Sequence, residues 1–412
     1  MKNVKAAAGV IVACVLLLGG TCVCAQDWPQ WRGPNRDGKV TGFTAPKTWP
    51  KELKETWKVT VGEGVATPAL VGDKLYVFSR QGGDEILRCL SAADGKEVWK
   101  EKYASAGWQG IDSSFQGPRS SPAVADGKVV TLGALGILSC FDAATGKRLW
   151  QKDDFKGSMP RFHVASSPII VDGLCVAQLG TGRSGGVMAY DLASGEQKWK
   201  WTGDGPGYAS PALLTLGGTK VIVAETAGTI VAVGAADGKL LWETAFKSQY
   251  NAPSPMVDGQ TVICSADGAG TKALKIEKDG DKASAKELWN RDAGALFNTP
   301  VVKNGLIFGI SASDKLFCLN AENGKTAWST ALGGGGGGGM GRSGYGSVVD
   351  AGSVLFALNP SGQLVVFEPT EKEFKEIAKY KLPKGGTYGY PVVSGNRIFV
   401  KDTDALTLWT IE

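Results

Sequence analysis

The chain has 412 residues, of which 58 are Gly and 13 are Trp, and it contains a single His, His163. Charged residues make up 21% and hydrophobic residues 43%, with a formal net charge of +5. This composition excludes a disordered chain, a multi-His metal site and a strongly basic nucleic-acid-binding protein. The Gly excess over the usual ~7% favours many turns and strands rather than a helical or doubly wound α/β enzyme.

Residues 1–25 have the pattern of an export signal. Two Lys residues precede an apolar run over residues 6–20, and the segment ends on Ala25. This predicts a signal peptide cleaved after Ala25, and hence a periplasmic or extracellular protein with no transmembrane helix in the mature chain. Cys14 lies in a sequence similar to a lipidation site, but the apolar run continues past it, so a lipid anchor is the weaker alternative. Loss of the two Lys residues would leave a charge of +3, which does not predict a nucleic-acid partner.

A Trp-rich leader follows over residues 26–52. Its first half contains Trp28 and Trp31 among Pro, Arg and Gly residues. Because two Trp side chains left in water are costly, we expect them to dock onto the rest of the chain.

A Gly-Lys-x-x-Trp pattern then recurs along residues 53–412. The Gly is expected at a hairpin corner that needs positive φ, and the Trp is expected to pack a flat surface against the neighbouring unit. The recurring Trp residues are 39 to 51 residues apart, and Tyr380, 52 residues after Trp328, falls where an eighth is due. The repeat residues are Gly95, Gly146, Gly195, Gly238 and Gly324, with Trp57, Trp99, Trp150, Trp199, Trp242, Trp289 and Trp328.

A second landmark opens each unit. It is a small polar residue or Pro that opens a hydrophobic strand, as in Ser121-Pro122 and Ser167-Pro168, and a complete unit continues with four short strands separated by Gly turns. Such units are typical of propeller blades. The last unit lacks its Trp strand, whereas the strand around Trp57 precedes the first complete unit. We therefore predict an all-β fold: one eight-bladed β-propeller over residues 53–412, with four antiparallel strands per blade, closed by pairing the N-terminal strand with the C-terminal blade.

The repeat also accounts for the cysteines. Cys89, Cys140 and Cys318 occupy one repeat position, where other units have Ala189 and Ala232. A small buried apolar residue is required there, and Cys serves as one. Equivalent positions on separate blades are too far apart to be bridged, so we predict no structural disulfide.

The repeat resembles that of a known family. The segment Phe141–Trp150 is similar to the PQQ-type β-propeller repeat, which occurs in quinoprotein alcohol dehydrogenases and in the BamB-like scaffolds of outer-membrane protein assembly. The leader segment Asp27–Gly38 resembles that of exported PQQ-like proteins common in planctomycete-type bacteria. The resemblance implies the propeller fold and leaves two functions open: a non-catalytic scaffold that binds envelope proteins, or a quinoprotein dehydrogenase.

The dehydrogenase branch places PQQ over a Ca²⁺ held by carboxylate and amide oxygens, with an Asp as base and often an adjacent Cys pair. This chain has no adjacent Cys residues, and Asp112, Asp204 and Glu225 are its nearest candidates near the channel. We predict no catalytic residue, no metal site and no cofactor; PQQ with Ca²⁺ is the alternative. A Gly-x-Ser-x-Gly pattern at 182–186 lies in an expected hairpin loop, whereas a hydrolase nucleophile requires a strand-to-helix turn.

The loops that join blades gather at one end of a propeller channel. In this chain they carry aromatic residues with Arg and Asn, which is the composition of interaction surfaces. We predict that a monomer binds a protein partner or an anionic envelope ligand there, with Arg119, Arg161 and Arg342 gripping carboxylate or phosphate groups. A run of seven Gly precedes Arg342 and is expected to behave as a flexible coil. The predicted rim consists of Trp108, Phe115, Arg119, Arg161, Phe162, His163, Tyr208, Tyr250, Asn251, Phe297, Asn298, Arg342, Tyr345, Tyr388 and Tyr390.

Overall fold

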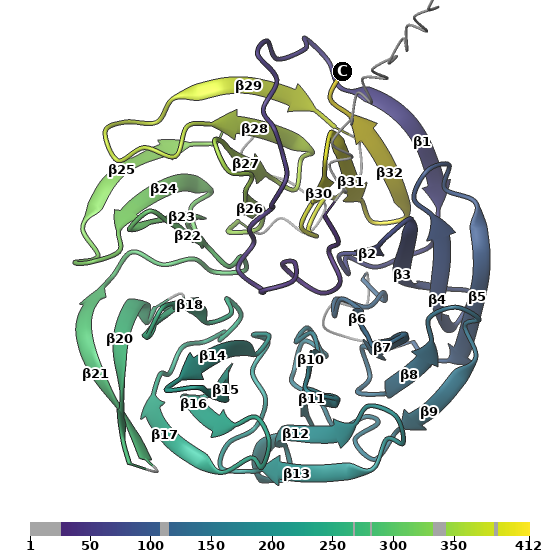
Figure 1. Ribbon diagram of the computed structural model, residues 1–412, viewed down its shortest axis with the longest axis vertical. Coiled ribbons are helices and arrows are strands. Elements are labelled where there is room, and N and C mark those ends of the chain that lie inside the picture. The colour runs from purple at the N-terminus through teal and green to yellow at the C-terminus, as the bar shows by residue number, and fades with distance from the viewer. Residues whose placement is uncertain (1–25, 108–114, 267, 281, 333–342, 383–385) are drawn as a thin grey trace, which may run out of the picture.

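Eight sheets surround a central axis in the computed structural model of the chain (Figure 1). The structure describes residues 26–107, 115–266, 268–280, 282–332, 343–382 and 386–412. Within these ranges, 32 strands form eight separate four-stranded sheets whose neighbouring strands pair antiparallel. The predicted all-β, eight-bladed propeller with four antiparallel strands per blade is therefore confirmed.

Within a blade, the first strand named is the innermost and the fourth is the outermost. Blade 1 contains β2 (Ala69–Val71), β3 (Lys74–Gln81), β4 (Asp84–Ser91) and β5 (Glu97–Ala104). Blade 2 contains β6 (Ala123–Ala125), β7 (Lys128–Leu132), β8 (Leu138–Asp142) and β9 (Arg148–Lys152). Blade 3 contains β10 (Ile169–Val171), β11 (Leu174–Leu179), β12 (Gly186–Asp191) and β13 (Gln197–Trp201), with the short 3₁₀ helix η1 (Gly182–Ser184). Blade 4 contains β14 (Ala212–Leu216), β15 (Thr219–Glu225), β16 (Thr229–Gly234) and β17 (Leu240–Ala245).

The second half of the ring repeats this order. Blade 5 contains β18 (Met256–Asp258), β19 (Thr261–Ala266), β20 (Gly270–Asp279) and β21 (Lys282–Arg291). Blade 6 contains β22 (Val301–Lys303), β23 (Leu306–Ile310), β24 (Lys315–Asn320) and β25 (Thr326–Ala331). Blade 7 contains β26 (Ser347–Asp350), β27 (Leu355–Leu358), β28 (Gln363–Phe367) and β29 (Glu376–Lys381). Blade 8 contains β30 (Val392–Ser394), β31 (Arg397–Lys401), β32 (Ala405–Thr410) and β1 (Lys54–Thr60).

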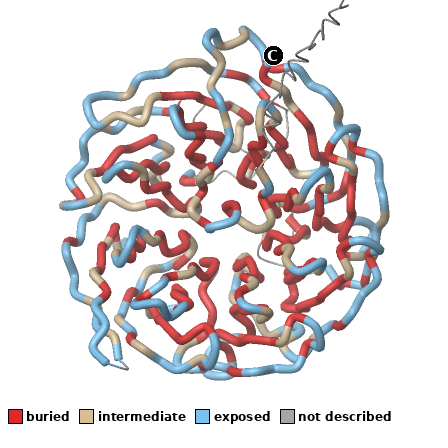
Figure 2. Tube along the Cα trace, in the orientation of Figure 1, coloured by how far each residue is buried: buried red, intermediate tan, exposed pale blue. Residues whose placement is uncertain are grey.

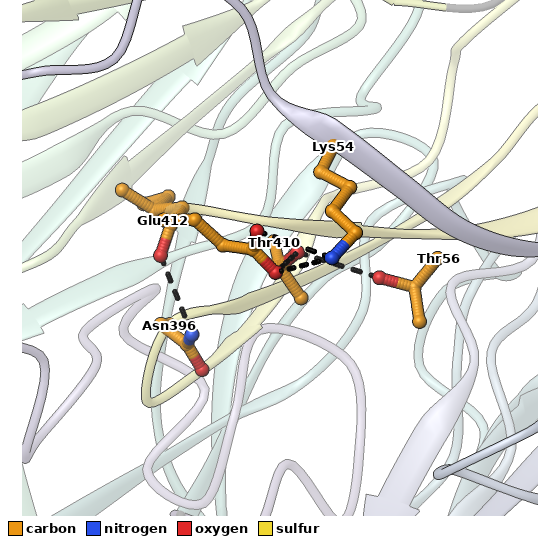
Figure 3. Close-up of polar contacts among 6 residues, drawn as sticks. Lys54, Thr56, Asn396, Thr410 and Glu412 are labelled. Atoms are coloured by element: carbon orange, nitrogen blue, oxygen red, sulfur yellow. Dashed lines mark hydrogen bonds and ion pairs between the residues drawn. The ribbon is translucent and has the colours of Figure 1, made fainter.

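The two ends of the propeller meet in blade 8, as predicted. Strand β1 pairs antiparallel with β32, from Lys54 opposite Thr410 to Thr60 opposite Ala405. Around this junction, Lys54 Nζ contacts Glu412 Oε1 at 2.9 Å, and Asn396 Nδ2 donates to the Ile411 carbonyl at 3.3 Å (Figure 3). Because Lys54 and Glu412 are exposed, their ion pair contributes only about 0–1 kcal/mol. The backbone ladder between β1 and β32 therefore provides most of the closure.

Glycine and tryptophan of the repeat lock neighbouring blades together. The Trp150 indole of blade 2 donates from Nε1 to the Leu192 carbonyl of blade 3 at 3.0 Å and lies against Gly195. A Cβ on Gly195 would lie 2.8 Å from that indole, and Gly195 has φ of 72°. Glycine is thus required twice, for the left-handed conformation and for the close approach of the ring. Trp99 makes the same contacts with Ala143 and Gly146.

Small residues face these tryptophans across the ladder. Cys89, Cys140 and Cys318 are directly opposite Trp99, Trp150 and Trp328, and Ala189 is opposite Trp199. The five cysteines in the described ranges are buried and free, so they form no disulfide there. Burial raises the pKa of the Cys140 thiol to about 12, which leaves it un-ionised and unreactive at neutral pH.

The Ser/Thr landmark forms a chain of hydrogen bonds around the channel. In each link, the backbone N–H of one blade donates to the hydroxyl of the next blade. Tyr390, just before β30 of blade 8, takes the place of the hydroxyl of blade 7. Its phenol oxygen accepts from Thr299 N of blade 6 at 3.0 Å, and its own backbone N–H donates to the Thr67 hydroxyl of blade 1 at 2.9 Å. The remaining links are Thr67 to Ser121 (3.0 Å), Ser121 to Ser167 (2.9 Å), Ser167 to Ser210 (2.9 Å), Ser210 to Ser254 (2.7 Å) and Ser254 to Thr299 (2.8 Å).

The core lies between the blades. Buried residues occupy the inner and middle strands, and exposed residues follow the circumference (Figure 2). One cluster joins blades 3 and 4, another joins blades 4 and 5, and the same pattern continues around the ring. The largest cluster also takes in Trp28 and Val40 of the leader. The leader is therefore part of the folded core, and Trp28 docks as expected.

Candidate functional site

The leader lies across one end of the channel, where it crosses the centre of the ring (Figure 1). Trp28 is fully buried and exchanges two backbone hydrogen bonds with Leu70 of blade 1, at 2.7 and 2.9 Å. Val124 of blade 2 donates to the Pro29 carbonyl at 2.8 Å, and Val40 donates to Asp350 of blade 7 at 2.7 Å. Backbone bonds to blades on different sides of the ring hold the leader over the channel.

Two buried arginines fix the centre of the leader. Arg32 donates to the carbonyls of Thr299 and Pro300 in blade 6, at 2.5 and 2.8 Å. Arg36 donates to the Pro168 carbonyl in blade 3 at 2.8 Å. Burial, together with the charge of Arg32, lowers the pKa of Arg36 to about 9. Both guanidinium carbons lie about 5.5 Å from the ring centroid of Trp31, so two cation–π contacts hold this indole, which lines the channel cavity.

Above Trp31 the channel encloses a cavity of about 180 Å³. Trp31 and Tyr390 form its floor, with their rings in an edge-to-face contact at 5.8 Å. The Ser/Thr hydroxyl chain and two small residues, Ala165 and Ala252, surround its middle. The leader thus closes one end of the channel beneath this cavity.

Seven aromatic side chains, which we call the aromatic belt, line the upper part of the cavity. The rings are Phe115, Tyr388, Tyr345, Phe297, Tyr250, Phe162 and Tyr208, each from a loop that joins two blades. Neighbouring centroids in this order are 6.4, 5.1, 4.5, 5.7, 5.5 and 6.2 Å apart. Six of the seven rings are only half-buried, and Phe115 is buried. The belt therefore presents apolar surface to the cavity while its rings support one another.

Two arginines lie over rings of the aromatic belt. The guanidinium of Arg119 lies 5.1 Å from the Phe115 centroid, and that of Arg161 lies 5.4 Å from the Phe162 centroid. Burial raises the pKa of Tyr208, and the charges of Arg119 and Arg161 both oppose this rise. Both cations therefore act electrostatically on the Tyr208 hydroxyl.

The other predicted rim residues have different surroundings. His163 is buried with φ of 66° and does not line the cavity. Asn251 is buried and donates to the Thr226 and Phe246 carbonyls, both at 2.8 Å, so it shapes its own loop. Asn298 lines the cavity, and its Nδ2 donates to the Ile310 carbonyl at 2.6 Å. Trp108, Arg342 and the Gly run 333–339 lie outside the described residues.

Trp31 was not among the predicted site residues, and neither were the hydroxyls that line the cavity. A signal for the leader was present in the sequence: two Arg residues flank a Pro-Asn turn directly after Trp31. Two cations beside an aromatic residue favour cation–π contacts with it. Only the folded propeller shows which backbone carbonyls these two Arg side chains reach.

The described lining does not provide a Ca²⁺ site. Ca²⁺ binds six to eight oxygen ligands from carboxylates, carbonyls and water, whereas the described cavity wall contains no carboxylate and Arg119 is its only charged side chain. Asp204 accepts from Thr226 Oγ1 and Gly228 N, both at 2.8 Å, and so stabilises a loop. Glu225 is fully buried outside the cavity, and Asp112 is not described. Among the described residues, no three His, Cys, Asp or Glu side chains gather where they could hold a metal ion.

The Gly-x-Ser-x-Gly pattern lies in η1, inside the hairpin between β11 and β12. The Ser184 hydroxyl donates to the Thr181 carbonyl at 2.9 Å on the exposed surface. This is not the strand-to-helix turn that activates a hydrolase nucleophile, so the pattern does not indicate a hydrolase active site.

Glu225 predicts an unusual pH dependence. Burial raises its pKa well above the ordinary value, with the Cys264 thiol opposing the rise, so the folded state holds a proton that the unfolded state releases above about pH 4.5. Stability should therefore fall as pH rises beyond that point. We expect Glu225→Gln to unfold at a higher urea concentration than wild type at pH 8 and at an equal concentration at pH 4. Equal midpoints at both pH values would show that Glu225 does not titrate in this way.

Among the described residues, no helix has the length and apolar character that a membrane crossing requires. Eight four-stranded blades with the Gly-Trp repeat define a PQQ-like β-propeller. The chain belongs to the family described as outer membrane protein assembly factor BamB, whose model matches residues 36–211 and 183–412. The outer membrane protein assembly factor BamB of Yersinia pestis is 23% identical over 371 residues, which covers 84% of this chain and 86% of that protein.

Solved structures share the fold. BamB from Moraxella catarrhalis superposes with a TM-score of 0.65 at 15% identity, covering 87% of this chain and all of that chain. The quinohemoprotein alcohol dehydrogenase of Comamonas testosteroni superposes with a TM-score of 0.63 at 16% identity, covering 93% of this chain and 80% of that chain. In sequence, a protein of that name from the same organism is 27% identical over 157 residues, which is 37% of this chain and 22% of that protein.

Proposed function

We propose that this propeller is a non-catalytic scaffold of the bacterial envelope that binds a protein partner at the mouth of its channel. The observation that supports this most strongly is the aromatic belt around a cavity closed at its far end. Half-buried aromatic rings with Arg are the side chains that most often contribute the binding energy of protein interfaces. Membership of a family described by outer membrane protein assembly agrees with this role.

The same proposal includes an exported, periplasmic location and function without a cofactor. The export pattern over residues 1–25 and the naming of the relatives both support the location. The quinoprotein dehydrogenase is the alternative, and it is favoured by the partial sequence match to the Comamonas enzyme. The absence of carboxylates from the described cavity wall argues against it, because the quinone of that branch requires a bound Ca²⁺.

Capture of envelope proteins by variants of the mouth tests the scaffold. Phe297 and Tyr345 stack at 4.5 Å in the aromatic belt, and changing both to Ala should reduce capture at least tenfold, because aromatic hot spots contribute ~2 kcal/mol or more each. The matched control changes the exposed Lys147 and Arg148 of the blade 2 outer hairpin to Ala and should leave capture unchanged. Equal capture by wild type and the mouth variant would refute the site.

Titration of the purified protein with PQQ and Ca²⁺ tests the alternative. We expect no saturable change in quinone absorbance and no dye-linked oxidation of alcohols. Tight quinone binding with turnover would establish the dehydrogenase instead.

A further inference from the structure

A second, smaller cavity lies between the leader and blades 4 and 5. One wall is the leader turn, with Asn35, Arg36 and Lys39, and the other is formed by the inner strands, with Leu213 and Val257. It shares no described lining residue with the channel cavity. Its volume is about 30 Å³. Since one water molecule requires roughly 10–15 Å³, the space suits two water-sized atoms, such as the two oxygens of one small polar group.

Arg36 keeps one edge of its guanidinium unused in this wall. Its Nη1 and Nη2 donate to the consecutive carbonyls of Pro168 and Ser167, at 2.8 and 3.1 Å, and Nη1 also donates to Gln30 Oε1 at 3.1 Å. Its Nε is buried and has no described acceptor. Because Arg36 is only 5% exposed, a donor left without an acceptor there is unfavourable. Two parallel N–H groups on one edge of a guanidinium are what a carboxylate binds bidentately.

Arg32 adds a second buried charge beside this edge but no unused donor. Its nitrogens donate to the carbonyls of Arg36, Asp37, Thr299 and Pro300 and to the Tyr390 hydroxyl. Burial and the charge of Arg32 together lower the pKa of Arg36 to about 9. Neither guanidinium forms an ion pair within the described ranges, so two buried cations face only neutral oxygens there. An anion bound in the cavity would relieve their repulsion.

Lys39 also lacks a counter-ion in the described part of the chain. Asp37 is the one carboxylate in the described lining, and its Oδ1 accepts from the backbone N–H of Lys39 at 3.1 Å. Asp350 of blade 7 forms a backbone bridge with Lys39, but its carboxylate pairs with Lys303 at 2.8 Å. Three cations therefore line the cavity against one carboxylate, and the ammonium of Lys39 is available to a ligand.

We propose that this cavity binds one carboxylate group, held by the Nε edge of Arg36 and by the ammonium of Lys39. The inference goes beyond the scaffold function, because it concerns a site outside the channel cavity. Leu213, Met256 and Val257 give the opposite wall an apolar surface, which suits a short apolar stem behind the carboxylate. A small organic acid has this chemistry, and so does an Asp or Glu side chain of a polypeptide.

Titration with sodium acetate tests the site in the full-length protein. Acetate should raise the urea midpoint of unfolding saturably, whereas sodium chloride at the same ionic strength should not, and calorimetry should give the same half-saturating concentration. A blocked Gly-Asp-Gly peptide separates the sources. Tighter binding of acetate identifies a small acid, and tighter binding of the peptide identifies a polypeptide side chain. No saturable binding of either probe, or tighter binding of inorganic phosphate than of both, would overturn the proposal.

Variants of the leader turn locate the binding. Lys39→Ala should weaken acetate binding about tenfold or more, because it removes a charge-assisted hydrogen bond. The matched control, Lys47→Ala, removes the same charge from an exposed leader position outside the cavity and should change nothing. Lys39→Ala should also leave capture of the envelope partner unchanged, so this proposal and the scaffold function fail independently. Undiminished acetate binding to folded Lys39→Ala would overturn the site.

An internal carboxylate should replace the ligand. Asn35 lines the cavity from an exposed position, and Asn35→Asp adds a carboxylate there without changing the size of the side chain. We expect this variant to unfold at a higher urea concentration than wild type without acetate and to lose the response to acetate. Asn35→Ala, the control, should keep the response. An Asn35→Asp protein that is no more stable than wild type and responds fully to acetate would contradict the proposal.

Discussion

Arg32→Ala should destabilise the propeller by about 3 kcal/mol or more. Arg32 is 1% exposed and donates to the carbonyls of Thr299, Pro300 and Asp37, as well as to the Tyr390 hydroxyl. Hydrogen bonds from a charged group contribute about 1.5–3 kcal/mol each, and their buried acceptors would lose their partner. The free energy of unfolding in urea measures the loss.

The control for Arg32 is Arg183→Ala, which removes an exposed arginine from η1 and should change stability by less than about 0.5 kcal/mol. Arg32→Ala should also increase protease cleavage within residues 26–52, because the leader would lose its hold on blade 6. A variant as stable as wild type would mean that the leader is not part of the cooperative fold.

Gly146→Ala should destabilise the junction between blades 1 and 2 by about 2–5 kcal/mol. Gly146 has φ of 77°, and a Cβ there would lie 2.5 Å from the Trp99 ring. The left-handed conformation costs an L-residue about 1–2 kcal/mol, and the forced shift of the indole adds about 1–3 kcal/mol. The free energy of unfolding again measures the effect.

Gly127→Ala is the matched control in the same blade. Gly127 has φ of 68°, but nothing lies within 4 Å of the Cβ that would be added. Only the conformational cost should remain, so this variant should lose about 1–2 kcal/mol. Equal losses at positions 127 and 146 would show that the contact with Trp99 contributes nothing.

The contrast between these two glycines shows what the sequence could predict. A repeated Gly-Lys-x-x-Trp spacing indicates blades, their number and their closure, because each copy must satisfy the same hairpin and the same packing. The positive φ of Gly146 follows from its place at a hairpin corner. The close contact between Trp99 and Gly146 does not follow from the repeat spacing. Trp99 belongs to the preceding blade, and only the folded propeller brings its indole against Gly146.

The candidate site was predictable to a similar extent. All seven rings of the aromatic belt were found from their place before the strand-opening Ser/Thr, because that position is set by the repeat. Trp31 was not found, because the leader lies outside the repeat and its path depends on carbonyls supplied by blades 3 and 6. His163 and Asn251 share the rim loops but turn into the protein, which their sequence neighbours do not reveal.

Site-specific photo-cross-linking in intact cells tests the central claim most directly. A photoreactive phenylalanine analogue placed at Tyr345 points from the aromatic belt into the mouth, whereas the same group at Arg148 lies on the outer edge of blade 2. We predict a discrete cross-linked protein adduct from position 345 and none from position 148. An adduct from position 148 alone would contradict the account and place the partner on the circumference of the ring.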